Sequence, residues 1–110
     1  MVADTLDLPA PVRAALAAAN ANDLEAFLDC FSEDAVVGDW GWELQGRDEI
    51  RAWSDREFIG AKVSLEVTAV EGRNGKTVVA VEVGGEGFNG PSRFKFQIEG
   101  DKVTRMMIRV

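Results

Sequence analysis

The side chains able to do chemistry in this chain are few, because its 110 residues include no histidine and no tyrosine. Histidine-activated nucleophiles, histidine-ligated zinc and phenolic acids are therefore excluded. Cys30 is the only cysteine, so no intrachain disulfide or thiolate cluster can form. We interpret Cys30 as a small packing residue, and we expect no metal and no cofactor. Acid and base chemistry in this chain therefore depends on other side chains, carboxylates among them.

The hydroxyl of Ser92 is predicted to lie on the apolar face of a strand. Ser92, Phe94 and Phe96 alternate onto one face of a predicted strand, and Met106 and Ile108 share that face from the next strand. A lone hydroxyl at the edge of an apolar wall is typical of a ligand pocket that recognises one polar group. The alternation therefore predicts that these five side chains line a pocket.

Two stretches of the first third have apolar residues at helical spacing, residues 12–19 and 24–31. Asn22 stands three residues before Glu25, which predicts a capping box at the start of the second helix. A third helix is predicted within residues 46–60. Each helix has one apolar face, so each needs a partner surface to cover it.

The remaining segments read as strands. Residues 35–37 and 42–44 predict a small hairpin between the second and third helices. From residue 62 the apolar period changes to two, and Asn74-Gly75 is a strong hairpin signal between alternating valines. We therefore expect an α+β fold, with three N-terminal helices packed on a curved antiparallel sheet made of a small hairpin and a four-strand meander.

Charge and composition indicate which classes of partner are not expected. The formal net charge of −7 repels phosphate backbones and anionic lipid surfaces, so neither nucleic acid nor membrane is an expected partner. Residues 1–110 have the length of a single domain, and no apolar run approaches the roughly 18 residues of a membrane span. The first residues show no secretory signal, so a cytoplasmic location is expected.

The face of the predicted sheet opposite the valines carries charges of both signs. Such a surface suits a self-complementary interface, which predicts a homodimer, while a solvated sheet face is the alternative. The residues concerned are Glu66, Glu82, Arg93, Lys95, Gln97, Arg105, Met107 and Arg109.

Two segments resemble a known family. Residues 22–37, from Asn22-Asp23-Leu24-Glu25 through Ala35-Val36-Val37, and residues 46–53, Gly-Arg-Asp-Glu-Ile-Arg-Ala-Trp, are similar to the nuclear transport factor two-like superfamily. This superfamily includes SnoaL-like polyketide cyclases and ketosteroid isomerases. The resemblance implies a cystatin-like cone with a pocket between the helices and the concave face of the sheet.

The resemblance also implies a role for Asp39, which falls where ketosteroid isomerases carry their general-base aspartate. The two oxyanion donors of those enzymes are not carried over, because Ala15 and Ser92 occupy their positions. The alternative for Asp39 is a turn residue that hydrogen-bonds its own backbone. Glu43 is interpreted as solvated.

The predicted function is binding of a small, largely apolar molecule, with Asp39 as the acid or base if the chain is a cofactor-independent isomerase, cyclase or hydrolase. The alternative is a non-catalytic dimerisation or ligand-binding module whose pocket is filled by its own tryptophans. The predicted ligand contacts are Ala15, Trp40, Trp42, Trp53, Ser92, Phe94, Phe96, Met106 and Ile108.

Overall fold

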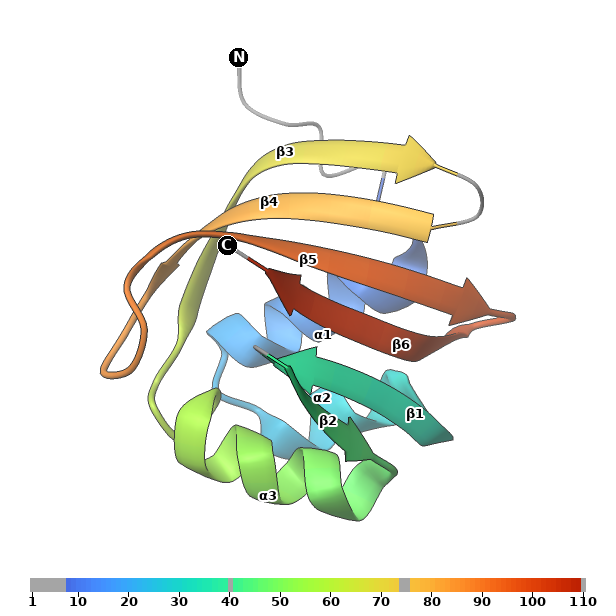
Figure 1. The fold of residues 1–110 in the computed structure, drawn as a ribbon, viewed down its shortest axis with the longest axis horizontal. Helices are drawn as coiled ribbons and strands as arrows, with labels where there is room; N and C mark the ends of the chain where they lie inside the picture. Colours follow the sequence, from blue (N-terminus) through green and yellow to red (C-terminus); the bar gives the residue numbers. More distant parts are fainter. Residues whose placement is uncertain (1–7, 40, 74–75, 110) are drawn as a thin grey trace.

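The structure, a computed structural model, describes residues 8–39, 41–73 and 76–109, and in these ranges helices pack on one face of a six-stranded sheet (Figure 1). The helices are α1 (Ala10–Asn20), α2 (Leu24–Asp29) and α3 (Arg47–Glu57). The strands are β1 (Phe31–Asp39), β2 (Trp42–Gln45), β3 (Ser64–Arg73), β4 (Lys76–Gly84), β5 (Gly90–Glu99) and β6 (Lys102–Arg109). The predicted α+β fold with three helices is confirmed.

The strand order is β2-β1-β6-β5-β4-β3. The hairpin β1–β2 and the meander β3–β4–β5–β6 are antiparallel, as expected. β1 and β6 pair in parallel, with Val37 opposite Met106 and Asp39 opposite Ile108, so the sheet is mixed rather than wholly antiparallel. No tight turn joins these two strands, because α3 and four strands intervene, and local turn signals therefore do not fix their relative direction.

The second helix is shorter than its apolar pattern indicates. It ends at Asp29, and Phe31 begins β1 instead of closing the helical stripe. Phe31 is fully buried and its ring centroid lies 4.9 Å from that of Phe27. The cap also differs, because the Asp23 carboxylate, not Asn22, accepts a hydrogen bond from the backbone N–H of Ala26 at 3.1 Å.

The alternation predicted for β3 breaks at a bulge. The register with β4 shifts between Val67 and Ala69, so Ala69 is exposed and Val70 packs against the core in its place. The predicted Asn74-Gly75 turn lies outside the described residues. Its flanking residues Arg73 and Lys76 pair antiparallel, as a hairpin requires.

The core lies between the helices and the concave face of the sheet. Ser92, Phe94 and Phe96 of β5 are buried on this face together with Met106 and Ile108 of β6, so the predicted register is confirmed. None of the described helices has the length and hydropathy needed to cross a membrane.

Candidate functional site

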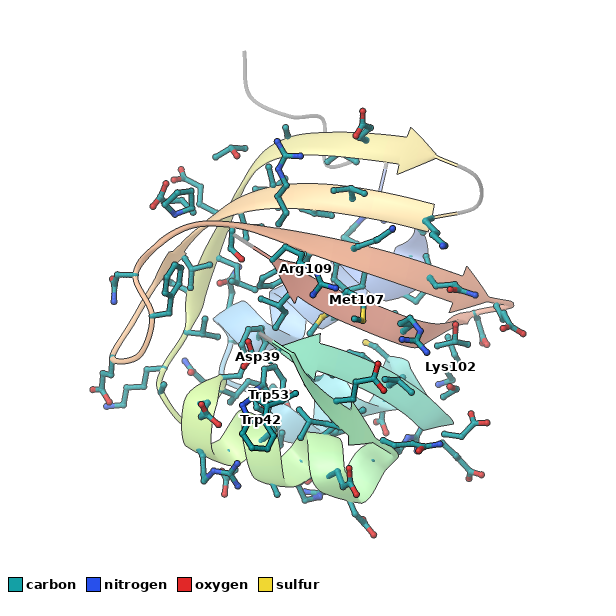
Figure 2. All side chains as sticks on the ribbon, in the orientation of Figure 1. Asp39, Trp42, Trp53, Lys102, Met107 and Arg109 are labelled. Carbon is teal, nitrogen blue, oxygen red and sulfur yellow. The ribbon has the colours of Figure 1, made fainter. Side chains whose placement is uncertain are left out.

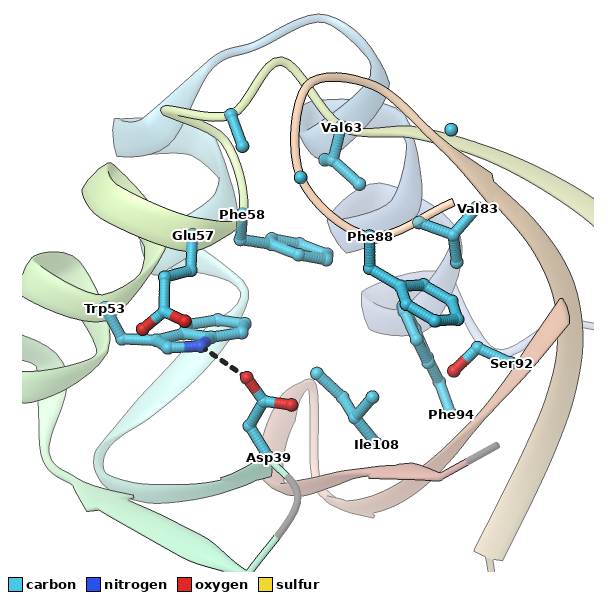
Figure 3. A pocket seen from close by; sticks show the side chains of 13 residues that line it. Asp39, Trp53, Glu57, Phe58, Val63, Val83, Phe88, Ser92, Phe94 and Ile108 are labelled. Atoms are coloured by element: carbon cyan, nitrogen blue, oxygen red, sulfur yellow. Dashed lines mark hydrogen bonds between the residues drawn. The ribbon is translucent and has the colours of Figure 1, made fainter. Parts of the chain in front are cut away.

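A cavity of about 60 Å³ lies at one end of the concave face, where α3, the ends of β1, β4 and β6, and the start of β5 come together (Figure 3). Its wall is mainly apolar. The lining residues are Asp39, Trp53, Glu57, Phe58, Ala61, Val63, Val83, Gly84, Gly87, Phe88, Ser92, Phe94 and Ile108.

Asp39 is the polar centre of this cavity. It is the last residue of β1 and is half-buried, and its Oδ2 accepts a hydrogen bond of 2.9 Å from Nε1 of Trp53 on α3 (Figure 3). Trp53 is 3% exposed, so packing of its ring fixes the position of this donor. Within the described residues, Oδ1 has no hydrogen-bond partner and no cationic side chain pairs with the carboxylate. One oxygen is thus oriented and the other remains available.

Ser92 lies in the wall with its hydroxyl already engaged. The residue is 5% exposed, and its Oγ donates to the backbone carbonyl of Arg109 at 2.5 Å. A carbonyl oxygen can only accept, so the hydroxyl hydrogen is used in this bond. Towards the cavity, Ser92 can therefore act as an acceptor.

Aromatic rings occupy much of the space. Trp53 stacks on Phe58 with ring centroids 5.0 Å apart, and Phe58 lies 6.1 Å from Phe94 in a tilted arrangement. Phe88, in the glycine-rich segment between β4 and β5, is 48% exposed at the cavity. Ligand pockets commonly have about 300–1,000 Å³, so this cavity admits a molecule of few non-hydrogen atoms.

Five of the predicted site residues come together in this lining: Asp39, Trp53, Ser92, Phe94 and Ile108. Their convergence follows from the parallel pairing of β1 with β6, which sets Asp39 beside Ile108, and from the antiparallel pairing that sets Phe94 opposite Ile108.

The other predicted contacts lie elsewhere. Ala15, Phe96 and Met106 are fully buried deeper in the core, where the helices cover the middle of the sheet. Trp42 is 77% exposed on the edge strand β2, outside the lining, because β2 lies beyond β1 at the end of the sheet (Figure 2). Trp40 lies outside the described residues.

The sequence interpretation missed Glu57 and Phe88 as lining residues. Glu57 lies at the end of α3 and forms an exposed ion pair with Arg56 at 3.5 Å. Phe88 follows a run of glycines and belongs to no periodic element. A large apolar residue in such a segment was a signal that could have been used. Phe58, Val63 and Val83 are buried and lie at the boundary between the core and the cavity.

Cys30 lies outside the cavity, where its Sγ donates to the carbonyl of Ala26 at 3.3 Å. Burial raises the pKa of this thiol, which favours the unreactive protonated form. Among the residues that the structure describes, no group of acidic or cysteine side chains is arranged to hold a metal ion.

Helices covering a curved sheet, with a cavity at the end of its concave face, define the class of cone-shaped, nuclear transport factor two-like α+β proteins. The chain belongs to the SnoaL-like domain family, whose model matches residues 12–106. The predicted superfamily is thereby confirmed.

Solved structures of the same fold include several from bacteria. A proposed polyketide cyclase from Sinorhizobium meliloti is 27% identical, with 96% of this chain and 99% of that chain covered and a TM-score of 0.85. A protein of ketosteroid isomerase-like fold from Catenulispora acidiphila, in complex with trimethylamine, is 21% identical, with 93% and 85% covered and a TM-score of 0.77. The second likeness shows the fold alone. No curated protein sequence matches this chain.

Proposed function

We propose that this cavity binds a small, largely apolar molecule and that Asp39 is the group that exchanges a hydrogen bond or a proton with it. The observation that carries the proposal is the half-buried carboxylate, with Oδ2 bound by Trp53 and Oδ1 without a partner among the described residues. Membership of the SnoaL-like family supports it, as does the likeness to the Sinorhizobium protein over nearly the whole of both chains.

The same geometry suits proton transfer of the isomerase or cyclase type. A general base must come within about 2.6–3.2 Å of the proton that it removes, directly or through one water. Oδ1 would take a proton from one atom of the bound molecule and return it to another, which leaves the carboxylate unchanged after each turnover. The Trp53 hydrogen bond would hold the carboxylate in one orientation throughout.

One observation favours a non-catalytic module instead. At about 60 Å³ the cavity is small for this class of site, because Trp53, Phe58 and Phe88 project into the space. If its own aromatic side chains close the cavity, the domain would function by binding partners at its surface.

Nuclear magnetic resonance of the ¹⁵N-labelled chain separates these readings. The indole N–H of Trp53, assigned with Trp53→Phe, reports directly on the Asp39 hydrogen bond. Titration with a library of small organic molecules should shift this signal saturably, while the exposed Trp42 signal stays in place. Failure of every compound to shift the Trp53 signal would favour the closed, non-catalytic module.

Compounds that bind can then be incubated in D₂O and examined for deuterium incorporation at carbon. We expect incorporation with the wild-type chain and its loss in Asp39→Asn. Asp55→Asn makes the same chemical change at an exposed position of α3 and should leave the rate unaltered. Equal rates in the wild type and Asp39→Asn would remove the catalytic role of Asp39.

A further inference from the structure

Among the residues that the structure describes, the polar side chains of the cavity offer hydrogen-bond acceptors and no free donor. Asp39 and Glu57 present carboxylates, and the hydrogen of Ser92 is already donated to the Arg109 carbonyl. The remaining side-chain donor in the lining, Nε1–H of Trp53, is taken by Asp39. A ligand that itself has only acceptors, such as a ketone or a carboxylate, would lose its bonds to water and gain none from these side chains.

No lysine or arginine is found among the described residues that line the cavity. The ion pairs of the described residues engage Glu25, Glu43, Glu57 and Glu86, and none engages Asp39. A carboxylate that is half-buried in an apolar wall attracts a positive charge more strongly than one in bulk water. The net charge of −7 adds a long-range attraction of the same sign.

The apolar part of the wall adds to this attraction. The described part of the lining includes four aromatic rings, those of Trp53, Phe58, Phe88 and Phe94. The face of an aromatic ring carries partial negative charge and attracts organic cations, while alkyl groups pack against it.

The volume limits the size of the ligand. A site of about 60 Å³ holds roughly four to six water-sized groups, since one water needs about 10–15 Å³ of such space. This volume therefore suits a compact ligand in which three or four non-hydrogen atoms surround one central atom.

From these four observations we propose that the cavity recognises a small alkylammonium ion, whose N–H donates to Asp39 and whose alkyl groups lie among the aromatic rings. This inference rests on the proposed binding function and names the chemical class of its ligand. It does not depend on catalysis.

The test uses three molecules with the same skeleton: isopropylammonium, 2-propanol and acetone. The first is a charged donor, the second a neutral donor and the third an acceptor alone. Each is titrated at pH 7 and constant ionic strength while the Trp53 indole signal is followed. We expect isopropylammonium to bind at least tenfold more tightly than 2-propanol, and acetone to give no saturable shift.

The outcomes separate this inference from the function on which it rests. Acetone or 2-propanol binding as tightly as isopropylammonium would overturn the inference and leave the proposed binding function intact. A Trp53 signal that responds to none of the three, but does respond to other molecules of the library, would also overturn it. No response to any molecule would remove both proposals.

Matched variants locate the preference in the cavity. Asp39→Asn should weaken isopropylammonium binding at least tenfold and 2-propanol binding less than threefold, because the amide keeps an acceptor and loses the charge. Asp55→Asn removes one charge from the exposed side of α3 and should change neither affinity. Phe88→Leu, which removes a ring and retains an apolar side chain, should weaken cation binding several-fold. A cation preference unchanged in both Asp39→Asn and Phe88→Leu would contradict the proposal.

Discussion

Asp39 is held by a neutral partner, and this sets it apart from Glu25, whose carboxylate is paired with the guanidinium of Arg51. A hydrogen bond from an indole fixes the orientation of a carboxylate without neutralising its charge. The negative charge of Asp39 is therefore still available to whatever enters the cavity.

We expect Trp53→Phe to destabilise the fold, because it removes this hydrogen bond and part of a buried ring. A hydrogen bond to a charged group is worth about 1.5–3 kcal/mol, and partial hydration of Asp39 should reduce the loss towards the lower value. The free energy of unfolding from urea titration measures the change. A loss below about 0.5 kcal/mol would show that the bond contributes little.

Residue by residue, the sequence predicted several of the residues that line the candidate site. Ser92, Phe94 and Ile108 followed from alternation, and Asp39 from the family resemblance. Phe88 lies in a connecting segment, where no period says which way a side chain points. Glu57 lies four residues after Trp53 on α3, so the helical period could have placed it on the same face as Trp53.

At the scale of elements, Asn20 connects the end of α1 to the edge strand β3. Its Oδ1 accepts from the backbone N–H of Leu65 at 2.6 Å, and its Nδ2 donates to the carbonyl of the same residue at 2.9 Å. β3 lies at the end of the sheet, so these two backbone groups face no further strand. The side chain covers part of an edge that would otherwise be open to pairing with another chain.

Asn20→Ala should lower the free energy of unfolding by about 1–3 kcal/mol, because two backbone groups lose their partners. Asn20→Asp keeps the acceptor and loses the donor, so it should fall between the wild type and Asn20→Ala. Urea denaturation of the three proteins gives the order. Equal stability of all three would show that water replaces the side chain at no cost.

A second link joins α2 to α3, where Arg51 donates to both carboxylate oxygens of Glu25, at 3.1 Å to Oε1. These hydrogen bonds hold the pKa of Glu25 below its ordinary value. Because the folded pKa is lowered, the pair stabilises the fold above the unfolded pKa of glutamate, and this contribution disappears as the pH falls through the folded pKa.

Arg51→Gln should return the pKa of Glu25 to its ordinary value. Titration of the Glu25 carboxyl carbon by NMR in the two proteins measures the change, and the exposed Glu33 serves as the control that should not move. A Glu25 pKa that is the same in both proteins would mean that the pair does not persist in solution.

The boundaries of elements were predicted less well than their existence. Phe31 satisfies an apolar helical stripe and equally begins a buried strand, so the pattern alone could not end α2 at Asp29. The bulge after Val67 was also missed, because it depends on the register with β4 rather than on the β3 sequence.

At the scale of the whole molecule, the outer face of the sheet is the surface proposed for a homodimer. Arg93 and Lys95 of β5 are exposed there, while Glu66 and Glu82, paired across β3 and β4, give acidic charge on neighbouring strands. A twofold axis that brings the basic strands of one copy over the acidic strands of the other would make these surfaces complementary.

Light scattering of the purified chain should therefore give twice the monomer mass. Lys95→Glu should shift the equilibrium towards the monomer, whereas Arg56→Glu, the same kind of charge reversal on exposed α3, should not. A monomer at high micromolar concentration would remove this proposal.

The single domain predicted over residues 1–110 has a test of its own. Tryptophan fluorescence and far-ultraviolet circular dichroism should show one unfolding transition with the same midpoint, as a cooperative unit requires. Two separated midpoints would indicate independently folding parts.

The position of β6 between β1 and β5 affects how the chain can fold. β6 is the last strand of the meander and pairs with β5 on one side and with β1 of the hairpin on the other. The two parts of the sheet therefore meet at the β1–β6 pair. The hairpin and the meander each contain local contacts that can form early. Pairing of Asp39 with Ile108 closes a loop over most of the chain, and the conformational entropy lost in closing this loop delays the pairing of β1 with β6. Because Asp39 and Ile108 both line the cavity, a partly folded chain in which β6 has not yet paired with β1 lacks the proposed binding site, and we expect ligand affinity to appear only with this late step of folding.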